Sequence, residues 1–310
     1  MYFPYLRGRQ FELIALRELM EGKSISNKIV PIVEPIKPTS TLVKTIQAYS
    51  KNGNSIALIC NPGVGDFVKD INQLTKENSP IASTLIEETT KESLIKSYII
   101  KKGTPPNIKE KKDKYEYLII NPNRDCIDAF LHIYEEGMPR FVLIPNDLAL
   151  KRLIPSSKVL LVDHFNKQTR NLDYISNDDE FFSSDHLDYQ EEGFVGFSDY
   201  SVVGLEFNES GFAPIAVAIH IVYFNVRKEL RIKHFVSDSN EDINDPAKKF
   251  GEALSKLVRW CDENNIYKTE GLKQFYEYYN TGRYPGLGTV KKLSIMHHLE
   301  LMSKFLEGEI

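Results

Sequence analysis

Polar side chains interrupt three apolar, strand-like stretches in the second half of the chain, and they are the first candidates for chemistry. The stretches read GFVGFSDYS, IAVAIHIVYF and LRIKHFVSD, and the interruptions are Asp199, His220 and His234. A polar group inside a buried strand costs free energy unless it is paired, so such groups often mark a functional site. A carboxylate and two imidazoles close together suit general acid–base catalysis or the binding of a divalent metal.

The spacing of the two histidines predicts that they face each other. Only residues 225–229 separate the last two stretches, and a link that short predicts an antiparallel hairpin. If the hairpin pairs symmetrically about Arg227, His220 lies directly opposite His234 on one face of the sheet. The alternative for each histidine is a core imidazole that hydrogen-bonds to a neighbouring group.

Further polar side chains stand where other apolar stretches end. They are Glu34, Asn61, Asn121, Asp147, Asp163 and His164. The ends of parallel strands meet at one mouth of a barrel, so these groups are expected to form a site with Asp199. For the asparagines the alternative is turn formation, because Asn-Pro and Pro-Asn pairs favour turns.

A pair of adjacent histidines, His297 and His298, lies in a helix-like segment near the end of the chain. Neighbours on a helix diverge by about 100°, so both cannot easily face one ligand. The apolar stripe of the segment places His298 further inward than His297. A structural hydrogen bond is the alternative role for either side chain.

The elements that must position these residues alternate between apolar strands and amphipathic helices. Strands are predicted at 28–36, 55–60, 115–120, 140–145, 158–165, 193–201, 215–224 and 230–238. Strands that are apolar on both faces and alternate with helices indicate a parallel sheet. The pattern predicts an α/β fold, a TIM-barrel-like (β/α)8 variant that is distorted by the late antiparallel hairpin.

The last third of the chain is predicted to be helical. Helices are expected at 245–264, 270–280 and 290–306, in addition to earlier ones near 8–21 and after Thr39 or Ser40, where Gly53 ends the helix. No linker is evident. We therefore predict a single barrel-like domain over residues 1–310, with a helical region, 241–310, packed on it.

Composition narrows the class of protein. The 310 residues carry a formal charge of −4, which excludes a global basic field for nucleic acid. The three cysteines are far apart, form no CxxC pair and suit a reducing compartment. No signal peptide is recognisable, and no run approaches the roughly 18 apolar residues of a membrane span. These features predict a cytoplasmic protein without a membrane partner.

Two segments lack a clear helix or strand pattern. Residues 101–114 combine Pro-Pro with six lysines, and they predict a solvated loop, with a nucleic-acid contact as the alternative. Residues 173–193 are acidic and too long for an ordinary connection between a strand and a helix. We expect this second segment to cover the face where the strands end.

Five sequence motifs together suggest a family. The stretches YFPYLRGRQFELIALREL, KIVPIVEP, VLLVDHF, GFSDYS and SIMHHLEL resemble the phage-type Beta protein family, and more closely its uncharacterised bacterial branch. The resemblance implies a barrel-like body, an Asp-Tyr element at Asp199 and Tyr200, and a late His-His element at His297 and His298. It also implies an association with phages and mobile elements. His220 occupies a region where the wider family carries an Arg-Tyr pair.

The sequence thus favours a metal-assisted hydrolase of phosphodiesters, with its site at the strand ends. The residues predicted to be catalytic are Glu34, Asp163, Asp199, His220 and His234, and those predicted to bind a ligand are Tyr200, His164 and His298. The cofactor expected, if any, is a divalent metal. The alternative is a non-catalytic binding or immunity-type subunit that acts through a protein partner encoded nearby.

Overall fold

The chain forms two compact units. The computed structural model describes residues 1–102, 117–136, 139–154, 157–208 and 214–310. Within these residues the first unit comprises 1–13, 26–163 and 185–200, and the second comprises 14–25, 164–184 and 201–310. Helix α1 (Gln10–Glu21) runs from one unit into the other. That the two units together form a single domain over residues 1–310 stays a prediction.

A parallel sheet is the centre of the first unit. In the described part of the chain its eight strands are β1 (Tyr5–Leu6), β2 (Ile32–Val33), β3 (Ile56–Ile59), β4 (Leu94–Ile99), β5 (Tyr117–Ile120), β6 (Phe141–Ile144), β7 (Lys158–Leu161) and β9 (Gly196–Ser198). Each pairs in parallel with its neighbour in this order. The fold is therefore mixed α/β and TIM-barrel-like.

The first and last strands of this sheet meet through backbone hydrogen bonds. The amide of Phe3 donates to the carbonyl of Phe197, and that of Tyr5 donates to the carbonyl of Asp199, each at 2.8 Å. The amide of Phe197 donates in turn to the carbonyl of Met1 at 3.1 Å. These bonds bring the sheet round on itself, which leaves little open edge.

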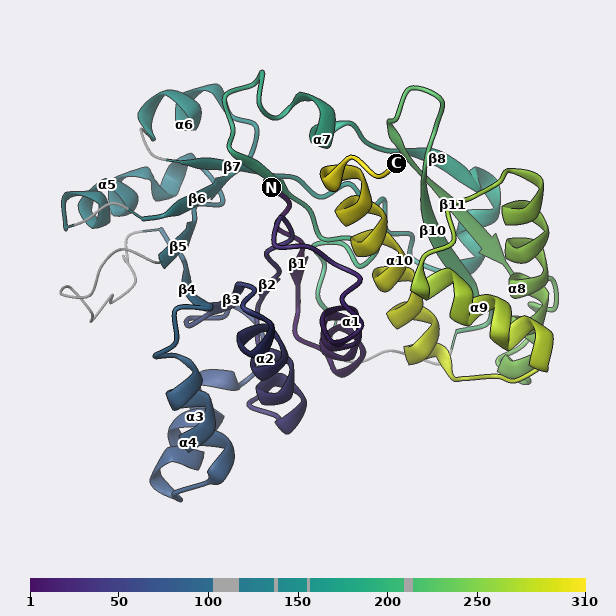
Figure 1. The fold of residues 1–310 in the computed structure, drawn as a ribbon, viewed down its shortest axis with the longest axis horizontal. Helices are drawn as coiled ribbons and strands as arrows, with labels where there is room; N and C mark the ends of the chain where they lie inside the picture. Colours follow the sequence, from purple (N-terminus) through teal and green to yellow (C-terminus); the bar gives the residue numbers. More distant parts are fainter. Residues whose placement is uncertain (103–116, 137–138, 155–156, 209–213) are drawn as a thin grey trace. The chain divides into compact units, whose positions relative to one another are not determined.

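Helices connect the strands of the first unit, and Figure 1 traces them along the chain. They are α2 (Ser40–Asn52), α3 (Phe67–Lys76), α4 (Pro80–Glu88), α5 (Ile127–Glu136), α6 (Leu148–Leu153) and α7 (Asp185–Asp188). The expected ends of α2 are confirmed. The side chain of Thr39 accepts from the amide of Leu42, and Gly53 ends the helix at φ +70°.

Apolar side chains fill the inside of the barrel. The packed cluster includes Phe3, Ile32, Ala57, Leu143 and Val159, all fully buried. Such a barrel is a core and not a pore, so a site of the barrel itself is expected where its strands end.

The late hairpin belongs to a different sheet, which corrects one prediction. Strands β10 (Ala218–Phe224) and β11 (Leu230–Val236) pair antiparallel, as expected, but they join β8 (Asp179–Ser183) in a three-stranded sheet of the described second unit. They are not the last strands of the barrel. Their places in it are taken by β1 and β4, which the sequence pattern did not predict.

The helical C-terminal region is confirmed. Its helices are α8 (Pro246–Glu263), α9 (Glu270–Thr281) and α10 (Leu287–Glu307). Helices α8 and α10 pack against the β10–β11 hairpin, and α9 packs against both helices, as Figure 1 shows.

The acidic segment 173–193 is structured, contrary to expectation. It contains most of the 3-10 helix η2 (Asn171–Asn177), then β8 and α7. Strand β8 is an edge of the antiparallel sheet, so this part of the segment is a strand and not a loop. The lysine-rich segment lies outside the described residues from 103 onward. None of the described helices combines the length and hydropathy that a membrane crossing requires.

Candidate functional site

The β10–β11 hairpin sets His220 against His234. A turn over residues 225–229 joins the strands, with Lys228 at φ +63°, and the pairing register places the two histidines directly opposite each other. The Nδ1 atoms of the two rings are 2.7 Å apart, which is a hydrogen bond between imidazoles. The predicted register, with the two histidines facing each other, is confirmed.

A carboxylate from the neighbouring strand continues this contact. Glu180 lies on β8, which pairs with β11, and its Oε1 is 3.4 Å from Nε2 of His234. The other oxygen of Glu180, Oε2, accepts from the side-chain amide of Asn177 at 2.7 Å, which holds the carboxylate in place. Glu180, His234 and His220 therefore form a chain of three titratable groups, called the imidazole relay below.

Aromatic rings enclose the relay. The ring centroid of Tyr174 is 4.7 Å from that of His220 and 4.5 Å from that of His234. Phe165 lies edge-on to His220 at a centroid distance of 5.2 Å. The His234 side chain has no exposed surface, whereas His220 is partly exposed. Packing of this kind fixes both rings in one orientation.

The hydrogen-bond partners decide which nitrogen carries each proton. A carboxylate only accepts, so Nε2 of His234 must be the protonated nitrogen that donates to Glu180. The Nδ1 of His234 is then an acceptor, and Nδ1–H of His220 donates to it. This assignment leaves the Nε2 lone pair of His220 as the open end of the relay, since no hydrogen bond to that atom exists within the described residues.

Burial favours the neutral form of both histidines. It lowers the pKa of His220 well below its usual value, and the neighbouring His234 and Lys291 act in the same direction. Burial also lowers the pKa of His234, although the carboxylate of Glu180 opposes the shift. Neutral imidazole is the form that a general base needs, and here it is the stable form at neutral pH.

In the barrel unit, both carboxylate oxygens of Glu34 accept hydrogen bonds. Its Oε2 accepts from the hydroxyl of Tyr5 at 2.7 Å and from the guanidinium of Arg7, and its Oε1 accepts from the amide of Gly63 at 2.7 Å. The Arg7 guanidinium also lies over the rings of Tyr5 and Tyr200. A buried carboxylate with three donors has the surroundings of a structural group, so we do not assign it an acid or base role.

Asp199 and Tyr200 make different contacts. Tyr200 belongs to the packed interior, where its ring is 4.8 Å from that of Tyr5. Burial raises the pKa of Tyr200 to about 12, and the carboxylates of Asp163 and Glu34 add to the rise while the guanidinium of Arg7 opposes it.

Asp199, directly after β9 (Gly196–Ser198), does not belong to that interior cluster, and its Oδ1 accepts from the hydroxyl of Tyr2 at 2.6 Å. The two adjacent residues that were predicted to act together therefore do not share one surface. Asp163 is exposed, unlike the buried Asp199.

The remaining predicted site residues lie in the second unit. The Nε2 of His164 is 3.2 Å from the hydroxyl of Ser183, and Nδ1 of His298 is 2.9 Å from the hydroxyl of Ser201. His297 was expected to be more exposed than His298, but both are fully buried, because α10 is covered on all sides along residues 292–303.

Two of the strand-end groups, Asn61 and Asp147, bind backbone groups of the first unit. The side chain of Asn61 exchanges two 2.8 Å hydrogen bonds with the backbone of Ile99, and so continues the sheet beyond β3. Asp147 caps α6 by accepting from the amides of Ala149 and Leu150.

The predicted site residues thus separate into two sets. Glu34, Asp163, Asp199 and Tyr200 belong to the first unit, whereas His164, His220, His234 and His298 belong to the second. Asp199 was the expected acid for the histidine pair, but Glu180 has that position. Glu180 lies in DEFFS, where two acidic residues precede two phenylalanines, so the stretch lacks the alternation that would have predicted a strand.

A metal site does not emerge from the residues that the structure describes. Among them, no three His, Cys, Asp or Glu side chains are grouped as ion ligands. Within the relay, hydrogen bonds engage Nδ1 of His220 and both ring nitrogens of His234.

Comparisons with known proteins do not assign a family. Neither a scan against protein-family models nor a search of curated proteins returned a match for this chain. The resemblance to the Beta protein family stays a prediction, and the function must be argued from the geometry.

Proposed function

We propose that the protein is a hydrolase of esters, phosphodiesters first among them, in which His220 is the general base. The observation that supports the proposal is the 2.7 Å contact between His220 and His234, continued by Glu180. A carboxylate behind an imidazole fixes its tautomer and stabilises the cation that forms when the imidazole takes up a proton. Here a second imidazole transmits that effect to His220.

The relay suits proton transfer because each proton that it shares has a defined donor and acceptor. When Nε2 of His220 removes a proton from water, the water oxygen bonds to the phosphorus or carbonyl carbon of the ester. The bond to the leaving oxygen then breaks, and the proton on His220 passes to that oxygen. Throughout, His220 keeps its Nδ1–H bond to His234, so the positive charge faces the carboxylate of Glu180 through one imidazole.

The experiment compares three chromogenic esters, bis(4-nitrophenyl) phosphate, 4-nitrophenyl phosphate and 4-nitrophenyl acetate, with the full chain. His220→Gln should lower the hydrolysis of the accepted ester by about a hundredfold to ten-thousandfold, the usual contribution of a general base. His132→Gln is the matched control, because His132 is exposed and should leave the rate unchanged. Circular dichroism would verify that both variants fold.

Two results would overturn the proposal. One is hydrolysis that persists in His220→Gln, and the other is the lack of His220-dependent hydrolysis with all three esters. The second result would favour the alternative function, a non-catalytic subunit that acts through a protein partner. The cytoplasmic location and the link to phage defence are predictions that this experiment leaves unchanged.

A further inference from the structure

A cavity lies beside helix α8, and His234 of the relay is one of the residues that line it. The cavity measures about 290 Å³. Its walls come from η2, β11 and α8, and the residues that line it are Ile175, Asp178, Lys233, His234, Phe235, Val236, Lys256, Arg259, Trp260 and Glu263. The volume is at the lower end for small-molecule sites, so it suits a small ligand.

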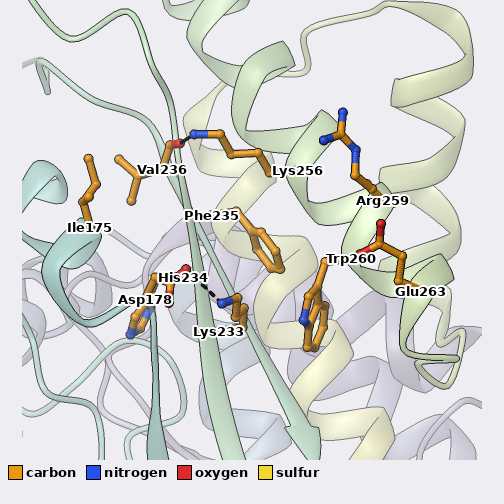
Figure 2. Close-up of a pocket in the computed structure, with 10 residues that line it drawn as sticks. All are labelled: Ile175, Asp178, Lys233, His234, Phe235, Val236, Lys256, Arg259, Trp260 and Glu263. Carbon is orange, nitrogen blue, oxygen red and sulfur yellow. Dashed lines mark hydrogen bonds and ion pairs between the residues drawn. The ribbon is translucent and has the colours of Figure 1, made fainter.

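Two aromatic rings form one wall of this cavity. Figure 2 shows the ring of Phe235 beside the indole of Trp260, whose centroids are 5.5 Å apart. Tyr223 packs edge-on against the same indole at 4.8 Å, which holds it in place. A fixed, partly exposed indole is a stacking platform for a flat aromatic ring such as a nucleobase.

The charged side chains of the cavity differ in how they are engaged. Lys233 is paired with Asp178 at 2.9 Å. Lys256 donates to the carbonyl of Val236 at 2.7 Å and to the carboxylate of Asp238 at 2.6 Å. Both lysines are therefore held by the protein itself.

Arg259 and Glu263, in contrast, have no ion pair or side-chain hydrogen bond within the described part of the chain. They lie one turn apart on the face of α8 that also carries Trp260, so all three side chains border the same cavity. An unengaged guanidinium is a bidentate donor that matches a phosphate. An unengaged carboxylate accepts hydrogen bonds from the hydroxyls of a ribose.

We propose that this cavity binds a single nucleotide unit, with its base on Trp260, its phosphate on Arg259 and its ribose hydroxyls on Glu263. Three cationic and two anionic side chains line the cavity, an excess of one positive charge. Lys233 and Lys256 are already paired within the protein, so Arg259 is the cation left for a ligand, and one guanidinium suits one phosphate. The site therefore suits a free mononucleotide better than a nucleic-acid strand. The inference does not depend on the proposed hydrolase.

The chain offers a direct signal for this binding, because Trp260 is its only tryptophan. Titration with 5′-AMP should quench the fluorescence of Trp260 to saturation. Arg259→Gln should weaken the affinity at least tenfold, and Glu263→Gln should reduce the preference for 5′-AMP over benzyl phosphate, which has no ribose. Arg283→Gln is the matched control, because Arg283 is exposed and does not line the cavity.

Calorimetry with the same variants gives a readout that does not depend on fluorescence. Equal binding of adenosine and 5′-AMP would overturn the proposal, because the phosphate would then contribute nothing. An undiminished affinity of Arg259→Gln would also overturn it. Tighter binding of a hexa-adenylate strand than of 5′-AMP would contradict the assignment to a free nucleotide.

Discussion

The Glu34 site of the barrel unit and the imidazole relay of the hairpin unit differ in how completely their polar atoms are engaged. In the barrel unit, Glu34 is surrounded by donors from Tyr5, Arg7 and Gly63, so each of its oxygens is occupied. In the hairpin unit, a chain of proton-sharing groups runs from Glu180 to His220 and ends at an atom without a partner among the described residues. A closed set of bonds holds a fold together, whereas an open end can exchange a proton with a substrate.

The largest expected effect concerns Glu34, whose two carboxylate oxygens are both hydrogen-bonded. Glu34→Ala leaves the buried Arg7 guanidinium without its counter-charge, and breaking a buried pair in this way costs about 3–5 kcal/mol. Hydrogen exchange of the barrel amides measures this loss within the first unit. Glu87→Ala, an exposed glutamate of the same unit, should change the exchange by far less. Equal effects of the two variants would show that the Glu34 bonds do not stabilise the barrel.

The second test concerns His297, a buried histidine with hydrogen bonds at both ring nitrogens. His297 accepts from the hydroxyl of Thr269 at 2.8 Å and donates to the carbonyl of Val222 at 2.7 Å, and burial lowers its pKa to about 4. The unfolded chain takes up this proton near pH 6.5 and the folded chain only near pH 4. Stability should therefore fall by about 3 kcal/mol as the pH drops through that window, at about 1.36 kcal/mol per pH unit.

Urea unfolding followed by the fluorescence of Trp260 measures this dependence in the second unit. His297→Gln should be less stable at neutral pH, but its stability should vary less between pH 6.5 and 4. The exposed His132→Gln should retain the wild-type pH dependence. An unchanged slope in His297→Gln would contradict the assignment of the buried neutral imidazole.

The smallest effect concerns the carboxylate of the relay. Glu180→Gln removes the charge that opposes the lowering of the His234 pKa by burial, while Asp178, Asp179 and Lys291 stay in place. The pKa of the relay should fall, so the acidic limb of the rate profile should move to lower pH and the rate at neutral pH should fall by about tenfold. An unchanged pH dependence of the hydrolysis rate would show that Glu180 takes no part in the proton transfer.

Local patterns predicted much of this architecture. The turn after Phe224 and the alternation of both flanking strands determined that His220 faces His234, because hairpin pairing depends on neighbours in sequence. Which sheet the hairpin joins depends on a distant strand, β8, and could not be read locally. Strand β4 escaped prediction because Lys96 and Ser97 interrupt its apolar pattern, and β1 because only two residues form it.

The site was predicted less completely than the fold. Asp199 and Tyr200 were grouped as one Asp-Tyr element through the family resemblance, yet Tyr200 belongs to the packed interior while Asp199 binds the hydroxyl of Tyr2. Glu180 was overlooked because a cluster of acidic residues before it resembles a solvated loop. A carboxylate that reaches a histidine from a separate strand is a tertiary feature, and the sequence contains no local pattern for it.

The protonation of the two facing rings tests the central claim most directly. Nuclear magnetic resonance of ¹⁵N-labelled histidines at neutral pH distinguishes which ring nitrogen carries the proton, with His220→Gln and His234→Gln used to assign the signals. The account predicts a proton on Nδ1 of His220 and on Nε2 of His234, with Nε2 of His220 unprotonated. A proton on Nε2 of His220 would leave that atom without a lone pair to accept a proton from water, and would contradict the account.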